Sequence, residues 1–177
     1  LSEAAKGLPS NGARNGSPYR IIYVGVGGSV MARSFTFFSK VLSRLRMRSA
    51  ELCAAIRIEL FGTILGWKHG EGRFLTDIDA KCGVDDLVHE EPSRLSYRRS
   101  LELLLQSDGA LIFGVDDAGY IPSKLFSYAL SGKPLLAILH REGPAVSKFQ
   151  SIPDQGHSLR IGKEEDMPLD EATNMLE

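Results

Sequence analysis

Short apolar runs rich in β-branched residues alternate along the chain with longer segments in which apolar residues recur every three or four positions. The short runs predict β-strands and the longer segments predict amphipathic helices. We expect strands near residues 20–24, 56–61, 87–89, 110–113, 135–139 and 158–161. We expect helices near residues 31–48, 96–106, 121–131, 145–150 and 169–176. This alternation predicts an α/β fold, a three-layer Rossmann-like sandwich with a mostly parallel sheet.

The helix expected at 31–48 has one apolar face and one basic face. The apolar face comprises Met31, Phe35, Phe38, Leu42 and Leu45. The basic residues are Arg33, Lys40, Arg44 and Arg48. The spacing predicts that the apolar set packs on the sheet and that the basic set is solvated.

Three other segments carry specific expectations about burial. Strand 56–61 alternates apolar and charged residues, which predicts an edge or half-exposed position in the sheet. The helix at 96–106, capped by Ser96, is expected to bury Leu101, Leu104 and Leu105. The helix opened by residues 121–123 is expected to bury Leu125, Phe126, Ala129 and Leu130 before it stops at Gly132.

Composition divides the chain into a linker and one domain. Residues 7–18 are rich in Gly, Ser, Asn and Pro, so residues 1–18 are predicted to be a flexible linker and residues 19–177 a single domain. Because the chain begins with Leu1, we expect a further segment upstream.

Charge and cysteine content narrow the function classes. Lys and Arg total 21 against 22 for Asp and Glu, a net charge of -1, so no long-range field favours binding to nucleic acid or to an anionic membrane. No apolar run is long enough to span a bilayer, and the first residues do not resemble a signal peptide. The two cysteines, Cys53 and Cys82, fit a reducing compartment, so a cytoplasmic location is expected.

A glycine-rich turn follows the first predicted strand. Gly25, Gly27 and Gly28 can bring bare backbone close to a phosphate, or they can serve only a tight turn from strand to helix. The segment is not a dinucleotide fingerprint, because Val30 stands where the third glycine belongs and no acidic residue ends the second strand.

Lys124 is expected in the first turn of a helix at the ligand edge of the sheet. A basic residue opposes the helix dipole at this end, which favours an anion sharing the site.

The segment around Lys124 resembles a known family. Pro122-Ser123-Lys124-Leu125-Phe126, with Tyr128 and Gly132-Lys133-Pro134, looks like a motif in the nucleotide-binding domain of GT-B glycosyltransferases of the group 1, family 4-like type. Tyr23-Val24-Gly25 resembles the opening strand and turn of that domain, and residues 101–114 resemble one of its helix-strand units. The resemblance covers residues 19–139 and implies the C-terminal, donor-binding domain of a two-domain enzyme.

The resemblance implies a nucleoside-diphosphate sugar, for example a UDP-sugar, as the ligand. It places Gly25, Gly27 and Gly28 near the diphosphate, and Ser123 and Lys124 at the phosphate or sugar edge. The family usually has a glutamate that holds the ribose hydroxyls where this chain has Ser127. Asp116 and Asp117 are nearby candidates to replace that carboxylate. The expected donor-binding set is therefore Gly25, Gly27, Gly28, Asp117, Tyr120, Ser123, Lys124 and Ser127.

No residue pattern predicts a metal site or a cofactor. Asp77-Ile78-Asp79 has the spacing of a metal-binding DxD motif, but it lies in a predicted helix without a preceding buried strand, so a solvated turn is expected. Adjacent acids such as Asp116 and Asp117 rarely ligate one ion together. The histidines are His69, His89, His140 and His157, and they lack metal-ligand spacing.

Two further sets of residues lie near the expected ligand edge. His140 follows a predicted core strand, so contact with the sugar or acceptor is a candidate role for it, with 141–143 beside it. Arg98 and Arg99 are expected to pair with Glu102 on the helix surface.

The sequence thus predicts a donor-binding domain that transfers a sugar to a sugar, lipid or small-molecule acceptor only together with an N-terminal domain. No residue is predicted to be catalytic. Peripheral membrane association of the full enzyme is compatible with the resemblance. Two alternatives stay open: a sugar-nucleotide epimerase of the same architecture, and a non-enzymatic α/β module that binds a nucleotide or a protein partner.

Overall fold

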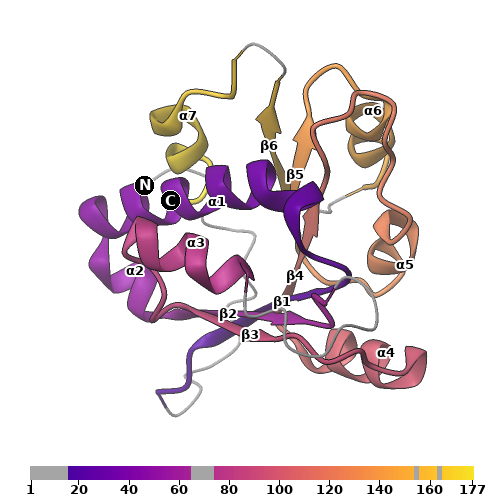
Figure 1. Cartoon of the computed structure of the whole chain (residues 1–177), viewed down its shortest axis with the longest axis horizontal. Helices are drawn as coiled ribbons and strands as arrows, with labels where there is room; N and C mark the ends of the chain where they lie inside the picture. Colours follow the sequence, from indigo (N-terminus) through magenta and orange to yellow (C-terminus); the bar gives the residue numbers. More distant parts are fainter. Residues whose placement is uncertain (1–15, 65–73, 154–155, 163–164) are drawn as a thin grey trace.

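The computed structural model describes residues 16–64, 74–153, 156–162 and 165–177. Six strands form one sheet in the order β3-β2-β1-β4-β5-β6, and helices cover both of its faces (Figure 1). Every neighbouring pair of strands in this sheet is parallel. The predicted three-layer α/β sandwich is confirmed. Residues 1–15 of the predicted linker lie outside the described residues.

The elements follow the predicted alternation. The strands are β1 (Tyr19–Val24), β2 (Ile56–Phe61), β3 (Val88–Glu91), β4 (Gly109–Phe113), β5 (Leu135–His140) and β6 (Gly156–Ile161). The helices are η2 (Ser29–Met31, a 3-10 turn), α1 (Ala32–Arg48), α2 (Ala50–Ala54), α3 (Phe74–Cys82), α4 (Tyr97–Gln106), α5 (Leu125–Ala129), α6 (Pro144–Gln150) and α7 (Leu169–Asn174). Of these, α2 was not predicted, and α3 corresponds to the helix expected around residues 77–79.

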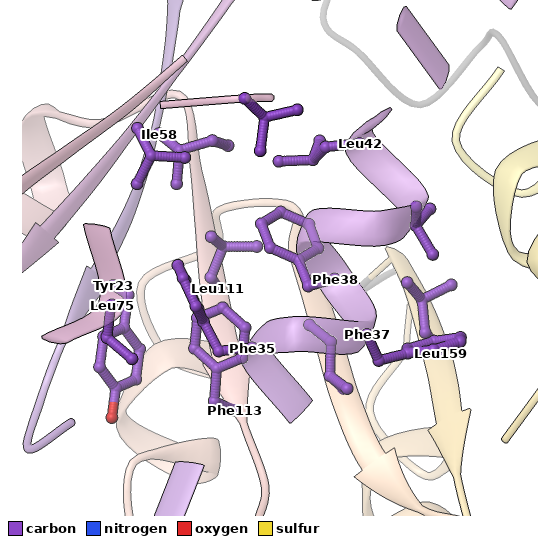
Figure 2. Packing of buried hydrophobic residues seen from close by; sticks show 14 of the residues in the cluster. Tyr23, Phe35, Phe37, Phe38, Leu42, Ile58, Leu75, Leu111, Phe113 and Leu159 are labelled. Carbon is purple, nitrogen blue, oxygen red and sulfur yellow. The ribbon is translucent and has the colours of Figure 1, made fainter. Parts of the chain in front are cut away.

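The larger part of the core lies between the sheet and the layer that contains α1. The predicted apolar face of α1 is buried, as is Met31 just before it. Three aromatic rings pack edge-on against Phe113 of β4, with centroid distances of 5.1 Å to Tyr23, 5.3 Å to Phe35 and 5.6 Å to Phe38 (Figure 2). Such pairs add about 0.5–1.5 kcal/mol each beyond area burial. This cluster fixes α1 across β1 and β4.

The opposite face is covered by α4, α5 and α6, and here three burial predictions are wrong. Leu105 is 62% exposed, because the buried side of α4 is formed by Leu103 and Leu104 and the next residue is rotated by about 100°. Phe126 is 54% exposed and Leu130 is 89% exposed. Helix α5 begins only at residue 125, and its buried side is formed by Leu125 and Tyr128.

The expected edge position of β2 is also wrong, because β2 lies between β1 and β3. Its charged residues are accommodated by ion pairs within the sheet. Glu59, only 8% exposed, accepts hydrogen bonds from Arg20 of β1 at 2.6 and 3.1 Å, and Arg57 lies 3.2 Å from it. The alternating pattern of β2 therefore reflects an ion pair between strands.

Strand β3 extends beyond the predicted end at residue 89. Glu90 belongs to the strand and is buried, and its carboxylate accepts hydrogen bonds from the Thr63 hydroxyl at 2.5 Å and from the Thr76 amide at 3.0 Å. Because its hydrogen bonds are satisfied, the Glu90 carboxylate can be buried within the strand.

The basic face of α1 is only partly solvated. Arg44 and Arg48 donate to the carboxylate of Asp170 at 2.9 and 2.7 Å, so they dock α7 against α1. Lys40 is exposed, as predicted.

Asp79 is fully buried, so the solvated turn expected for residues 77–79 is wrong for this residue, whereas Asp77 is exposed. Asp79 Oδ1 lies 2.7 Å from the Ser39 hydroxyl, which also lies 2.9 Å from the Phe35 carbonyl. The Ser39 hydroxyl has one proton, which it can donate to Asp79 Oδ1 or to the Phe35 carbonyl. Desolvation by burial raises the pKa of Asp79 to about 7, and the hydrogen bond from Ser39 opposes this rise.

The carboxyl end of β1 is held by side chains of the α5 segment. The ladder between β1 and β4 ends at the pair Ile22–Ala110, so Val24 lies beyond it. The Val24 amide donates to the Tyr128 hydroxyl at 3.0 Å, and this hydroxyl lies 3.1 Å from the Val24 carbonyl. Lys124 Nζ also donates to that carbonyl. Burial raises the pKa of Tyr128 to about 12, so its hydroxyl keeps the proton it donates.

We predict that Tyr128→Phe lowers the free energy of unfolding by about 1–3 kcal/mol, because the buried Val24 amide loses its partner. Urea denaturation measures the change. Tyr97→Phe is the matched control, since Tyr97 is 76% exposed on α4. Equal stability of both variants would show that the Tyr128 hydroxyl does not hold β1.

We predict that Asp79→Asn removes a pH dependence of stability. The folded-state pKa of Asp79 is raised from 3.8 to about 7, so its contribution is complete below about pH 4 and is lost as the pH rises to 7. The slope reaches about 1.4 kcal/mol per pH unit. The asparagine amide mimics the protonated acid at every pH, so the variant should become more stable than the wild type above pH 7. Urea denaturation at several pH values tests this, with exposed Asp77→Asn as control. A wild-type slope retained in Asp79→Asn would contradict the assignment.

Candidate functional site

The sheet changes its direction of winding between β1 and β4. From β1 the chain proceeds to β2 and β3 on one side, whereas β4, β5 and β6 follow on the other side. The loops that leave β1 and β4 therefore diverge at the carboxyl edge of the sheet. In open α/β sheets this divergence is where ligands bind.

A pocket of about 650 Å³ lies at this switch point. The loop after β1 contributes Val26, Ser29, Val30 and Met31, and the loop after β4 contributes Val115, Asp116 and Tyr120. The walls are mainly apolar, and polar side-chain groups come from Ser29, Asp116 and the Tyr120 hydroxyl. Such a pocket suits a ring with apolar faces and hydroxyl groups.

The three predicted glycines shape the turn at one side of the pocket. The Gly25 amide donates to the Phe61 carbonyl and the Gly27 amide to the Thr63 carbonyl, both at 2.9 Å. These amides are therefore engaged in the structure of the loop. Gly28 has a φ of 84°, a conformation that favours glycine.

Lys124 lies directly beside Gly25. A Cβ atom at Gly25 would lie 2.7 Å from Lys124 Nζ and 2.6 Å from the Tyr23 hydroxyl, so a larger residue would displace the ammonium group or the tyrosine ring from these positions. Lys124 immediately precedes α5 rather than lying in its first turn. Burial lowers the pKa of Lys124. The structure thus brings together the glycine turn and the lysine that the sequence singled out separately.

Ser123 and Ser127 do not line the pocket at the switch point. Ser123 is exposed, and the Ser127 hydroxyl donates to the Lys124 carbonyl at 3.0 Å within its own helix. In this conformation the Ser127 hydroxyl proton is engaged in a hydrogen bond at the start of α5.

Of the two neighbouring acids, Asp116 lines the pocket and Asp117 does not. Asp117 accepts a hydrogen bond from the Gly119 amide at 2.8 Å, which shapes the loop. Tyr120, at the end of the same loop, lines the pocket as well.

Arg33, which the sequence pattern assigned to a solvated face, contacts the pocket residue Asp116. Its guanidinium donates to Asp116 Oδ2 at 2.6 Å, to Asp166 Oδ1 at 3.0 Å and to the Gly162 carbonyl. The hydrogen bond to Asp116 raises the pKa of Arg33. The position of Arg33 at the start of a helix could have identified it from the sequence, as the same kind of position identified Lys124.

His140 is buried at the end of β5, and its Nε2 lies 3.8 Å from Asp116 Oδ1. His89 and His157 are exposed, and His69 lies outside the described residues. Arg98 and Arg99 lie 2.9 and 3.4 Å from Glu102, so the predicted surface pairing is confirmed.

Metal-binding clusters and membrane-spanning helices are both absent from the described residues. No group of three or more His, Cys, Asp or Glu side chains there is arranged to hold a metal ion. Within the same residues, no helix has the length and apolar character needed to cross a membrane.

Comparison with known proteins finds similarity in structure. No protein-family model matches the chain, and no curated protein matches it in sequence. Trehalose-6-phosphate synthase OtsA has a TM-score of 0.55 and 13% identity, over 90% of this chain and 35% of that chain. The GtfA/B complex has a TM-score of 0.52 and 14% identity, over 90% of this chain and 28% of that chain.

A UDP-forming α,α-trehalose-phosphate synthase from Burkholderia vietnamiensis has a TM-score of 0.53 and 10% identity, over 97% of this chain and 45% of that chain. The chain thus spans less than half the length of these solved structures. Identities this low show a shared fold. At the level of the fold, the chain is similar to one domain of GT-B glycosyltransferases, consistent with the resemblance of residues 120–134 to their C-terminal domain.

Proposed function

We propose that this domain binds a nucleoside-diphosphate sugar and forms the donor-binding part of a GT-B glycosyltransferase. The observation that carries the proposal is the pocket at the switch between β1 and β4, bounded by the loops 26–31 and 115–120. The resemblance of residues 120–134 to the family motif supports the same ligand class. The fold shared with trehalose-phosphate synthases agrees with both.

Two features supply positive potential for a diphosphate at this edge. Lys124 carries a cation beside the turn at Gly25. The consecutive η2 and α1 begin at Ser29, so their N-terminal end faces the pocket edge. In sugar transfer the diphosphate leaves with increased negative charge, and a preorganised cation and helix dipole stabilise it without a metal ion.

In this proposal the acceptor is held by a second domain. The domain described here spans 28–45% of the solved structures to which it is similar. Sugar transfer needs an acceptor hydroxyl aligned with the donor, and a cleft between two domains provides that alignment and excludes water.

We predict that one of UDP, GDP or ADP, or its sugar derivative, raises the melting temperature of the chain selectively. A ligand that binds only the folded state stabilises it by about 2.7 kcal/mol at a concentration of 100 times Kd. Differential scanning fluorimetry across this panel measures the shift, with the nucleosides as controls for the phosphate contribution. A flat result for every diphosphate would refute the proposed ligand class.

We predict that Lys124→Met weakens binding of the selected diphosphate about tenfold or more, because a charge-assisted hydrogen bond contributes about 1.5–3 kcal/mol. Methionine keeps the apolar stem beside Gly25. Isothermal titration calorimetry measures Kd, and Lys40→Met, at an exposed position on α1, is the control of equal charge. If Lys124→Met lowers only the melting temperature of the free protein and leaves Kd unchanged, Lys124 serves the fold and not the ligand.

A further inference from the structure

We infer that Asp116 is the group that accepts the hydroxyls of the ligand in this pocket, and that Arg33 is its positioning residue. The inference rests on the proposed function and names a recognition element within the same site. The shared chemistry is a vicinal pair of hydroxyls, which the ribose or the transferred sugar can supply.

The two oxygens of Asp116 have different surroundings. Oδ2 accepts a hydrogen bond from Arg33 at 2.6 Å, whereas Oδ1 lies 3.8 Å from His140 Nε2, beyond hydrogen-bonding distance. The carboxylate lines the pocket and its side chain is 41% exposed. One oxygen is thus anchored, and the carboxylate can still accept from a ligand.

His140 presents a ring nitrogen toward Asp116. The Glu142 amide donates to His140 Nδ1 at 3.3 Å, so in the neutral ring the proton is on Nε2, which faces Asp116. Asp116 therefore faces donors from two elements, α1 and the end of β5.

Arg33 is suited to position Asp116, because its guanidinium is itself fixed. Asp166 and the Gly162 carbonyl accept hydrogen bonds from the nitrogen of Arg33 that does not contact Asp116. The planar guanidinium thus holds three acceptors in defined directions. A carboxylate oriented in this way loses little side-chain entropy when a ligand binds.

The walls of the pocket fit a sugar ring. Val26, Val30 and Tyr120 offer apolar and aromatic surface, which packs against the C–H faces of a ribose or pyranose ring. A carboxylate accepts from both hydroxyls of a vicinal diol through charge-assisted hydrogen bonds. Ser127 is less suited to this role, because its hydroxyl donates to the Lys124 carbonyl and it does not line the pocket.

The opposite role for Asp116 would be to compete with a ligand anion for Arg33. The two roles predict opposite signs for one substitution. If Asp116 accepts ligand hydroxyls, Asp116→Asn and Asp116→Ala weaken binding. If Asp116 blocks an anion site, both substitutions tighten the binding of every phosphate ligand.

Calorimetry measures how much the affinity for a ligand depends on its hydroxyl groups. The proteins compared are the wild type, Asp116→Asn, Asp116→Ala and Arg33→Met. The probes are UDP, GDP and ADP, their 2′-deoxy counterparts and their glucose derivatives. Exposed Asp85→Asn is the control of equal charge. A preference for diphosphate over 2′-deoxy diphosphate identifies the ribose, whereas a preference for the glucose derivative identifies the transferred sugar.

We expect the wild type to show one of these preferences at about tenfold or more, and Asp116→Ala to reduce it to less than about threefold. Arg33→Met should reduce the preference similarly, and Arg33→Lys should restore part of it, whereas a merely structural role would lower stability without changing the preference. A preference retained in Asp116→Ala, or tighter binding in either Asp116 variant, overturns the inference.

Nucleosides and methyl glucoside, titrated by NMR into the same proteins, separate this inference from the proposed function. If a diphosphate binds without dependence on Asp116, the proposed function stands and this inference fails. If no diphosphate binds but a nucleoside or the glucoside binds in an Asp116-dependent manner, the inference stands and the proposed function fails. If none of the probes binds, both are wrong.

Discussion

The arrangement of the site depends on how the end of β1 is held. At Val24 the neighbouring strand β4 no longer provides ladder hydrogen bonds, and a buried backbone amide without a partner costs about 1–3 kcal/mol. Tyr128 supplies the missing partner from α5, and Lys124 adds a second donor to the Val24 carbonyl. The ammonium group then occupies the space that a side chain at position 25 would fill, and Gly25 leaves this space open. One set of contacts thus fixes β1, the turn after it and the start of α5.

The layers and strands of the fold could be predicted from the sequence because they depend on the local period of apolar residues. The face of α1 that packs around Phe113 is one such case. Predictions of burial and strand position failed where a residue pairs with a partner that is distant in the sequence. Glu59 made β2 resemble an edge strand, but Arg20 of the neighbouring strand pairs with it inside the sheet. Phe126 was expected inside, but Leu125 and Tyr128 form the buried side of α5.

The site could be predicted only in part, for the same physical reason. The glycine turn and Lys124 are local signals, each contained within a few residues. The contact between Arg33 and Asp116 joins positions 83 apart in the sequence, and the contact between Arg33 and Asp166 joins positions 133 apart. No periodicity connects such positions, so Arg33 resembled the solvated residues of an amphipathic helix. The pocket itself forms between two loops that are far apart in the sequence, 26–31 and 115–120.

In the proposed function, a nearly neutral chain binds an anion through the local charges around the pocket. Arg33 is balanced by two carboxylates, so it adds little net potential, whereas Lys124 contacts a carbonyl and not an acid. Burial lowers the pKa of Lys124, which means that its ammonium group lacks full solvation in the free protein. A phosphate beside Gly25 would provide the missing counter-charge in a partly desolvated setting, where such an interaction is stronger than in water. Affinity for the diphosphate would then depend mainly on Lys124, and selectivity for the rest of the ligand on the walls of the pocket and on Asp116.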